Sequence, residues 1–362
     1  MRSSLRTKWD HLYNGVEATY RRYAYTKKAK LRLKRMNGGY SCDEEYEKIV
    51  VPYWEKYGLK PKKMWYQLYW ERTHVADPRY IPDDLWFGTI VPYFSNPQFR
   101  RFGEDKCMHG VWFKDVNRPA TIAMNVAGVY YGPNYELLTK EEAMKACLCN
   151  RNILVKPSID SGEGRLITFF KKEEVTEEAI RTVFDKMGAN FIVQEEVRQH
   201  PVLAAMNESS LNTVRVVSLF FENEVHILST VLRVGAKGSK VDNVGAGGYA
   251  VVIRRNGELE EKGVNRKAEW CSETVDGVAF KGVKVPAFDE ILDIVKEQHK
   301  KLAHFKIVGW DFSVTEDGEP IFIEFNTCPG QNQYTEGPTF GDLTDRVLDE
   351  VFINKTLAKS SN

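Results

Sequence analysis

Two carboxylates and one amide at fixed spacing offer the clearest chemistry in this sequence. They lie in a segment of alternating apolar and polar residues, 307–326, whose centre, Asp317-Gly318, is a strong signal for a two-residue β-hairpin turn. Such a turn places Asp311 directly opposite Glu324, and Asn326 follows on the same face. Facing carboxylates repel each other unless a cation compensates them, and Mg²⁺ prefers oxygen ligands of this kind. The sequence therefore predicts a magnesium site formed by these three side chains.

The alternative is a surface hairpin whose acids are merely solvated. The apolar residues of the hairpin favour the metal site, because they predict that its other face is buried; these residues are Phe312, Ile321, Ile323 and Phe325. Pro320 has no N–H to donate toward Thr315, which weakens the pairing next to the turn.

A second segment has the residue types of an anion-binding loop. A predicted strand, 153–155, leads into Lys156 and then into a loop of small residues with Ser161, Gly162 and Gly164. Glycine lets backbone N–H groups approach a phosphate closely, and an upstream lysine adds positive charge. The loop is not a Walker A sequence, because no Gly-Lys-Ser/Thr closes it onto a helix. The residues alone indicate either a phosphate-binding loop or an ordinary hairpin turn.

Two arginines and one strand end are further candidates. Arg215 and Arg233 each lie within an apolar run that predicts a buried strand, where an unpaired guanidinium is costly. Their partners are either carboxylates of the protein or a bound phosphate or carboxylate.

The strand predicted at 191–193 runs into a mainly polar segment, 194–200, which ends at Pro201. Such a segment either offers backbone groups to an adenine edge or simply leaves the core.

The rest of the sequence predicts the elements that position these residues. Runs of β-branched and aromatic residues predict strands at 153–155, 191–193, 214–221, 225–234 and 249–253, and helical spacing predicts helices at 172–187 and 288–303. Aromatic residues and prolines between 40 and 105 predict short helices packed by large side chains. Mixed strands and helices predict an α+β fold.

Composition is that of a globular protein. The 362 residues include 51 Lys plus Arg and 50 Asp plus Glu, a formal net charge of +1. Hydrophobic residues at 43% and charged residues at 28% exclude collagen-like and disordered classes. No uncharged apolar run is long enough for a membrane-spanning helix. The N-terminal residues lack the apolar core of a signal peptide, so we expect a cytoplasmic protein whose six cysteines are unpaired.

The first 35 residues are strongly basic, with 11 Lys or Arg against Asp10 and Glu17. Spacings of three and four predict an amphipathic helix over 5–36 that ends at Gly38-Gly39; its stripe is Leu5, Trp9, Leu12, Tyr13, Val16 and Tyr20. The favoured interpretation is that this stripe packs on the protein body. The alternative is peripheral contact between residues 1–35 and an anionic membrane or an acidic partner. Nucleic acid is not an expected partner, because no base-stacking motif accompanies the basic residues.

Taken in order, these segments resemble the ATP-grasp superfamily, and in particular its sugar-transfer-associated family, which is linked with bacterial polysaccharide biosynthesis. The resemblance covers roughly residues 105–326. It rests on Asp105-Lys106, Lys156-Pro157 with the glycine loop, Gln194-Glu195-x-Val197, Asn212-x-x-Arg215, the 243–248 loop and Asp311…Glu324-x-Asn326. It implies an ATP-grasp fold of two α+β lobes that clamp ATP, preceded by a mainly helical, aromatic-rich region. We expect four parts: a basic helix (1–38), a helical region (39–104), an N-lobe with the glycine loop (105–198) and a C-lobe with the metal site (199–362).

The resemblance also implies a role for each candidate residue. By this resemblance, Lys106 and Lys156 bind the phosphates of the nucleotide, and the loop with Ser161, Gly162 and Gly164 closes over the triphosphate. Adenine is bound by the Gln194 side chain and by the backbones of Glu195 and Val197. Asp311, Glu324 and Asn326 bind magnesium, and Arg215, Arg233 and Asn243 stabilise the transferred phosphoryl group. Related ligases often have Asp-x-Arg where this chain has Thr213-Val214-Arg215, so the role of that Asp is absent here or filled elsewhere.

Members of this superfamily typically phosphorylate a carboxylate with ATP and let an amine attack the acyl phosphate. The resemblance therefore implies an ATP- and Mg²⁺-dependent carboxylate–amine ligase acting on small molecules, namely an amino acid or a sugar acid in surface polysaccharide synthesis. Two alternatives stay open: a small-molecule kinase that releases its phosphorylated product, and a non-catalytic nucleotide-binding scaffold. Substrate specificity is expected from the aromatic N-terminal half and from residues 331–334.

Overall fold

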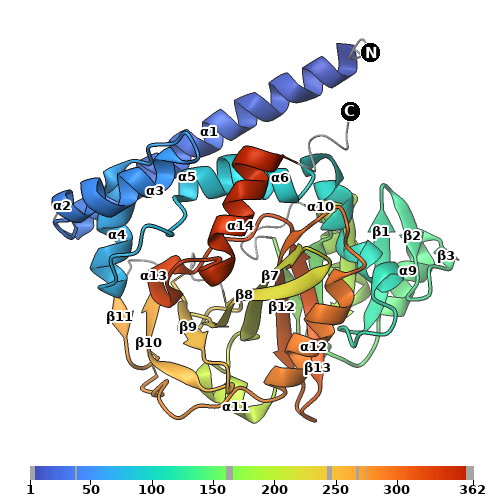
Figure 1. Ribbon diagram of the computed structural model, residues 1–362. Helices are drawn as coiled ribbons and strands as arrows, with labels where there is room; N and C mark the ends of the chain where they lie inside the picture. The colour runs from blue at the N-terminus through green and yellow to red at the C-terminus, as the bar shows by residue number, and fades with distance from the viewer. Residues whose placement is uncertain are drawn as a thin grey trace.

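A computed structural model describes residues 5–36, 39–159, 166–242, 247–265, 269–274 and 276–355, with side chains from residue 15 onward (Figure 1). Two sheets, one of six strands and one of seven, are both antiparallel. Helices form a layer of their own and also flank the sheets. The predicted α+β class is therefore confirmed.

Helices make up the region before residue 113. The predicted basic helix is α1 (Leu5–Arg35), a single helix of 31 residues. Shorter segments follow in chain order: α2 (Asp43–Glu45), η1 (Tyr46–Val50), α3 (Val51–Glu55), α4 (Lys63–Thr73), α5 (Asp83–Leu85), η2 (Trp86–Ile90), α6 (Val91–Phe94), η3 (Pro97–Phe99), α7 (Arg100–Gly103), η4 (Lys106–Met108) and α8 (His109–Trp112). Pro97 opens η3, where its missing N–H costs nothing. Pro52 and Pro92 are the second residues of α3 and α6, which directly follow the π-helical segments η1 and η2. Within the described residues, no helix is long and apolar enough to cross a membrane.

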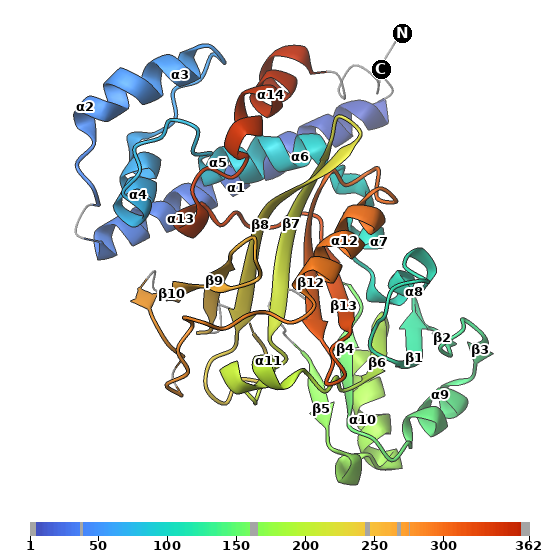
Figure 2. The same cartoon turned by 60° about the horizontal axis from the view of Figure 1, so that its bottom comes forward.

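Large aromatic side chains form the core of this helical layer. Trp54, Trp65 and Tyr66 are fully buried, and they share one hydrophobic cluster with residues from the end of the chain. That end contributes α13 (Gln333–Glu336), η8 (Gly341–Leu343), α14 (Thr344–Leu348) and η9 (Asp349–Asn354). Figures 1 and 2 show α14, in red, lying against the blue and cyan N-terminal helices. The two ends of the chain thus build one layer.

Helix α1 does not pack through its aromatic stripe where the structure describes it. Val16 and Tyr20 are exposed, whereas Ala29 on the opposite face is buried in the core of the layer. This inner face lies close to η2, because a Cβ on Gly88 would lie 2.6 Å from the Cγ of Arg22. The favoured sequence interpretation, that the stripe packs on the body, is therefore wrong for these residues. The face that packs on the layer instead carries Ala29, Arg22 and Tyr25.

The six-stranded sheet has the strand order β3-β2-β1-β6-β4-β5. Its strands are β1 (Thr121–Val126), β2 (Val129–Tyr131), β3 (Leu137–Leu138), β4 (Ile153–Pro157), β5 (Thr168–Phe170) and β6 (Phe191–Glu195). Helices α9 (Lys140–Cys147) and α10 (Glu177–Met187) begin at threonine caps, Thr139 and Thr176, and pack on it; η6 (Lys172–Glu174) precedes α10. The sequence predicted β4, β6 and the helix after residue 172, and it missed β1 to β3.

The seven-stranded sheet has the order β11-β10-β9-β8-β7-β12-β13. Its strands are β7 (Thr213–Phe221), β8 (Glu224–Val234), β9 (Tyr249–Ile253), β10 (Leu259–Asn265), β11 (Trp270–Cys271), β12 (Ile307–Val314) and β13 (Pro320–Asn326). Helix α11 (Pro201–Met206) precedes β7, and α12 (Phe288–His299) covers one face. The two sheets fall on either side of residue 198, although the four-part division of the chain stays a prediction.

Strand β7 links the protein core to a polar surface. Val214 and Val216 face the core under α12, whereas Val217 and Leu219 belong to the core of the helical layer. Because side chains alternate along a strand, Arg215 lies on the same face as Val217 and Leu219. It lies beyond the end of that core, where the face borders a cavity. The cavity thus begins where the helical layer stops.

The β12–β13 hairpin reaches the predicted register by an unexpected route. Its turn has three residues, 316–318, because Thr315 N–H donates to the Glu319 carbonyl at 2.9 Å. The two-residue turn predicted at Asp317-Gly318 is therefore wrong, and this shifts the pairing by one position near the turn. A β-bulge at Ile323 restores it.

Beyond the bulge, Asp311 pairs with Glu324, so the predicted partnership is confirmed. The bulge also changes which apolar residue of β13 is buried. Phe322 packs in the core with Phe312 and Phe325, whereas Ile323, predicted to be buried with them, lines the cavity.

A buried histidine connects α12 to the large sheet. Trp310 Nε1 donates to Ser218 Oγ at 2.8 Å, and that oxygen lies 2.8 Å from His299 Nδ1. His299 Nε2 lies 2.9 Å from the Phe305 carbonyl. A neutral His299 ring therefore completes this series of hydrogen bonds, with Nδ1 accepting from Ser218 and Nε2 donating to the carbonyl. Burial lowers the pKa of His299 to about 4, against a weaker opposing effect of the Phe305 carbonyl.

Acid should therefore destabilise the fold through His299. Its pKa in the unfolded chain is about 6.5, so between about pH 6.5 and 4 the unfolded state binds more protons. The free energy of unfolding is unaffected above this window and falls by roughly 3 kcal/mol across it as the pH decreases. Urea unfolding across this range measures the loss. His299→Gln keeps polar contacts without titrating and should show a shallower dependence; equal slopes for the two proteins would contradict the assignment.

Candidate active site

A cavity of about 710 Å³ lies between the two sheets and gathers the predicted site residues. All ten that fall within the described residues line it: Lys106, Lys156, Gln194, Glu195, Val197, Arg215, Arg233, Asp311, Glu324 and Asn326. The other four, Ser161, Gly162, Gly164 and Asn243, lie outside the described residues. The structure thus brings together side chains from segments up to 220 positions apart in the sequence. Their individual roles stay predictions.

Neighbouring strands place three charges in one row. Glu324 on β13 pairs with Asp311 on β12, and Asp311 pairs with Arg215 on β7. Cross-strand partners lie about 5 Å apart at Cβ, so the three side chains emerge side by side on the cavity face. Arg233 on β8 stands one pair further along, opposite Thr213. Strand pairing alone therefore produces the charged wall of the cavity.

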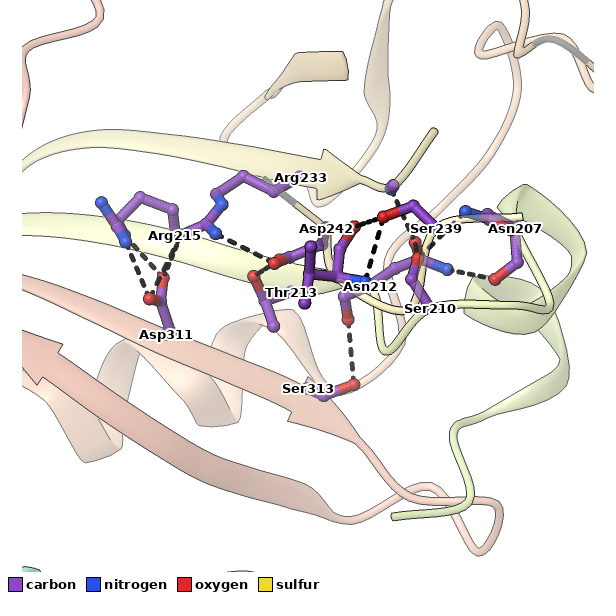
Figure 3. Close-up of polar contacts among 12 residues, drawn as sticks. Asn207, Ser210, Asn212, Thr213, Arg215, Arg233, Ser239, Asp242, Asp311 and Ser313 are labelled. Atoms are coloured by element: carbon purple, nitrogen blue, oxygen red, sulfur yellow. Dashed lines mark hydrogen bonds and ion pairs between the residues drawn. The ribbon is translucent and has the colours of Figure 1, made fainter. Parts of the chain in front are cut away.

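Two arginines share the carboxylate of Asp311 (Figure 3). Arg215 donates from Nε and Nη2 to its two oxygens at 2.6 and 2.7 Å, and Arg233 Nη1 lies 3.2 Å from both. Arg233 also donates from Nη2 to Asp242 at 2.9 Å. Burial alone would lower the pKa of Arg233, but Asp242 and Asp311 raise it further than burial lowers it. In this structure the anions that pair with these partly buried arginines are carboxylates of the protein itself.

Asp242 is a site residue that sequence reasoning missed. Its carboxylate accepts a hydrogen bond from Thr213, the residue that stands where related ligases often have Asp. Burial raises the pKa of Asp242, and the Arg233 guanidinium opposes that shift. A signal existed in the sequence: Asp242 is the only acid between Glu224 and Glu258, and a buried arginine needs a partner.

Two lysines approach this row of charges from the side of the six-stranded sheet. Lys106 begins η4, whose first turn is capped by the Asp105 carboxylate, and its Nζ lies 3.0 Å from Glu324 Oε2. Lys156 is buried on β4, and burial together with the charge of Lys106 lowers its pKa to about 8. Burial alone would raise the pKa of Glu324, but Lys106 and Lys156 outweigh it and hold that pKa at about 2. Glu324 is therefore ionised and faces two cationic groups.

Asn212 holds the start of β7 in place. Its side-chain amide donates to the carbonyls of Leu203 and Asn207, both at 2.8 Å, and its carbonyl oxygen accepts from Ser210 at 2.9 Å. Ser313 on β12 donates to its backbone carbonyl at 3.0 Å (Figure 3). Asn212 of the Asn212-x-x-Arg215 motif is thus a buried structural residue. It fixes the strand on which Arg215 stands.

Residues of the six-stranded sheet and its connections form an apolar end of the cavity. Leu154, Ile167 and Phe169 line it, beside the predicted adenine-reading segment. Gln194 is buried, and its amide lies 3.4 Å from the Pro119 carbonyl. Within the described part of the chain, no acceptor takes the N–H of Val197. This end offers flat apolar surface next to backbone polar groups.

Helix α1 and the loop after β13 supply another part of the lining. Arg32, Gly330 and Asn332 all border the cavity. The guanidinium of Arg32 lies 4.9 Å from the centre of the Tyr334 ring, and no described carboxylate lies within ion-pair distance of it. Arg32 was not among the site residues predicted from the sequence. Its position on the helix face opposite the aromatic stripe was the available signal.

Of residues 331–334, which were predicted to contribute to specificity, only Asn332 lines the cavity. Gln331 and Gln333 turn into the protein and donate to the Ile81 carbonyl at 2.8 and 2.7 Å, which ties the loop to the helical layer. Asn332 between them faces the cavity and donates to Ser229 at 2.8 Å. The loop crosses β12 closely, because a Cβ on Gly309 would lie 2.7 Å from the Cβ of Pro329.

Asp311, Glu324 and Asn326 fit a hard divalent cation by their donor chemistry. All three border one cavity, and the two carboxylates are cross-strand partners. Within the described residues, no three His, Cys, Asp or Glu side chains gather around one point. The protein would therefore offer two carboxylates and an amide oxygen, as Mg²⁺ sites completed by phosphates and water do. Both carboxylates are ion-paired with lysine or arginine in this structure, so a bound metal would compete with these partners.

The sequence matches a family model described as sugar-transfer associated ATP-grasp over residues 113–337. The chain belongs to this ATP-grasp family. The match contains every described candidate residue except Lys106 and Arg32. A comparison with curated proteins gave no match.

Several solved structures are similar to this chain, and three of them carry the names of ligases or a synthetase. One is the ATP-grasp ligase PsnB complexed with a minimal precursor, at 12% identity and a TM-score of 0.41, covering 71% of this chain and 64% of that one. Another is an L-amino acid ligase from Bacillus licheniformis, at 13% identity and a TM-score of 0.39; the match covers 69% of this chain and 48% of that one. A third is D-alanyl-alanine synthetase A from Vibrio cholerae, at 13% identity and a TM-score of 0.38; the match covers 71% of this chain and 66% of that one. The chain thus spans about half to two thirds of these structures, and the family assignment rests on the sequence match.

Asp311→Asn should destabilise the protein in the absence of any ligand. The substitution leaves the two partly buried guanidiniums with only Asp242, and breaking a buried ion-pair network from one side costs up to roughly 3–5 kcal/mol. Denaturant unfolding measures the change. Glu316→Gln is the matched control on the same hairpin, because Glu316 pairs with Arg198 at the exposed turn and should cost less than about 1 kcal/mol. Equal stability of the two variants would contradict the network.

Proposed function

We propose that this chain is an ATP- and Mg²⁺-dependent ligase that joins a carboxylate to an amine through an acyl phosphate. The proposed substrates are an amino acid or a sugar acid used in surface polysaccharide synthesis, in the cytoplasm, where ATP is available. One observation carries the proposal above all: two lysines, two arginines and the Asp311–Glu324 pair face one cavity between two lobes. This is the residue set that phosphoryl transfer needs, because its transition state spreads negative charge over several oxygens.

In the proposed reaction, the substrate carboxylate attacks the γ-phosphorus of ATP, the bond to the bridging oxygen breaks, and ADP leaves. The amine nitrogen then attacks the acyl carbon, the acyl–oxygen bond to phosphate breaks, and the amine loses a proton to solvent. Lys106 and Lys156 would bind phosphate oxygens, and Arg215 and Arg233 would bind the transferred group. Asp311, Glu324 and Asn326 would hold Mg²⁺, which when bound neutralises phosphate charge and aligns the transfer.

The nucleotide base would occupy the apolar end of the cavity. Leu154 and Phe169 offer surface for a flat ring, and the Val197 N–H has no described acceptor of its own. Glu195 N–H already donates to the Ala120 carbonyl at 2.9 Å, so only the Glu195 carbonyl could serve the base. The proposed adenine contacts therefore narrow to one carbonyl and one N–H, with Gln194 alongside.

An ADP-release screen tests the ligase proposal. Amino acids, sugar acids and nucleotide sugars are supplied singly and in pairs with ATP and Mg²⁺. A ligase should release ADP and phosphate steadily only when both a carboxylate and an amine are present. A stable phosphorylated product from one substrate alone would establish the kinase alternative instead.

Glu324→Gln separates catalysis from a scaffold role. The change removes the charge that the metal and Lys106 need, so ADP release should fall roughly a hundredfold or more. Glu208→Gln is the matched control, because Glu208 lines the same cavity at an exposed position away from the charged row. Unchanged turnover in Glu324→Gln would rule out the catalytic assignment.

Arg32 should bind the second substrate rather than ATP. It lines the cavity from α1, whereas the proposed adenine end belongs to β4 to β6, and within the described residues its charge is offset by the more distant Asp83 and by Tyr334. With a substrate from the screen, Arg32→Ala should raise the KM of the anionic substrate roughly 10- to 100-fold and leave the KM of ATP unchanged. Arg35→Ala removes the same side chain from an exposed site and should change neither. An equal rise in both KM values for Arg32→Ala would contradict the placement.

A further inference from the structure

The face of α1 that points away from the protein combines large apolar side chains with lysines. Four of its apolar residues are more than half exposed: Val16 at 62%, Tyr20 at 69%, Tyr23 at 67% and Leu31 at 53%. Lys27, Lys30 and Lys34 are exposed beside them. An exposed tyrosine alone needs no explanation, but a row of this kind along one helix does.

Helical spacing shows that these residues form a single strip, which we call the outer strip of α1. Positions 16, 20, 23, 27 and 30 follow one another at spacings of three or four, and 31 and 34 continue from 27 in the same way, so all seven fall within about a third of the helix circumference. The sequence continues the same spacing toward the N-terminus with Trp9 and Leu12. The inner face is already occupied, because Ala29 is buried and Tyr25 stacks on Phe87 with ring centres 3.9 Å apart. The outer strip is therefore not part of the core.

The charges along α1 are almost all positive. Glu17 is the only acid between residues 15 and 36, and Arg21 Nε donates to it at 2.8 Å. The first 35 residues carry 11 basic and two acidic side chains, while the remainder of the chain carries 40 basic and 48 acidic ones. A negatively charged surface would therefore attract this helix and not the rest of the protein.

We propose that the outer strip of α1 binds the surface of an anionic phospholipid membrane, with the helix lying in the plane of the headgroups. Tyrosine rings suit this interface, because the ring is apolar and the hydroxyl is polar. Lysine stems extend along apolar surface while the ammonium group reaches phosphate. A 31-residue helix is about 45 Å long, so many headgroups lie within reach. No described helix could cross the bilayer, so the contact is with its surface.

Co-sedimentation of the full chain with vesicles tests this proposal, which is independent of the ligase assignment. The protein should bind vesicles of phosphatidylcholine with phosphatidylglycerol, should not bind vesicles of phosphatidylcholine alone, and should be released by high salt. Lys27→Gln/Lys30→Gln/Lys34→Gln should reduce partitioning on the order of a hundredfold, since each basic residue near the surface contributes about a factor of five. Tyr20→Ser/Tyr23→Ser should weaken binding at every salt concentration.

Two controls keep the result specific. Lys296→Gln/Lys300→Gln/Lys301→Gln removes the same charge from the end of α12 and should leave binding unchanged. All variants should unfold at the wild-type temperature, because every altered side chain is exposed. Equal binding of the α1 and α12 triple variants would overturn the proposal. So would a protein that ignores anionic vesicles, or one that self-associates through the tyrosines, which would assign the outer strip to a second copy of the chain.

Discussion

Charge buried on the face of the large sheet must be compensated locally, and this constraint organises the cavity. Glu324, Asp311 and Arg215 are cross-strand neighbours, so any shift in register would separate them. Asp311 is buried, Arg215 and Glu324 are partly buried, and each lies beside a partner of opposite charge that offsets the cost of removing it from water. Lys106, Arg233 and Asp242 complete the balance. The geometry of three antiparallel strands thus determines which charges meet.

The same strands connect this charged row to the core. On β7, the face that carries Arg215 continues into Val217 and Leu219, which pack under the N-terminal helices. The helical layer is tied in turn to the loop after β13, through Gln331 and Gln333. Residues outside the matched region, including Arg32 on α1, therefore contribute to the cavity although they lie far from the motifs in sequence.

The sequence predicted the main elements of the site because its signals are local. Strand β4 and the Asp311–Glu324 pairing follow from short runs of residues, as does α1. The three-residue turn at 316–318 and the bulge at Ile323 could not be read in this way, because two irregularities cancel and leave the same pairing. The pairing was thus predicted correctly from an incorrect turn. Asp242 was missed for another reason: its partner is defined by tertiary contact and not by spacing.

The direction in which α1 faces shows why amphipathic spacing alone is ambiguous. A helix with an aromatic stripe and many basic residues has two candidate faces for packing, and the aromatic one is the more apolar. The structure buries the other face, where Ala29 permits close approach and Arg32 reaches the cavity past Tyr334. Small residues allow close packing, and the aliphatic stem of Arg32 can lie along apolar surface while its guanidinium reaches the cavity. The inner face thus holds the helix to the layer and brings Arg32 to the cavity, while the described residues of the aromatic stripe stay exposed.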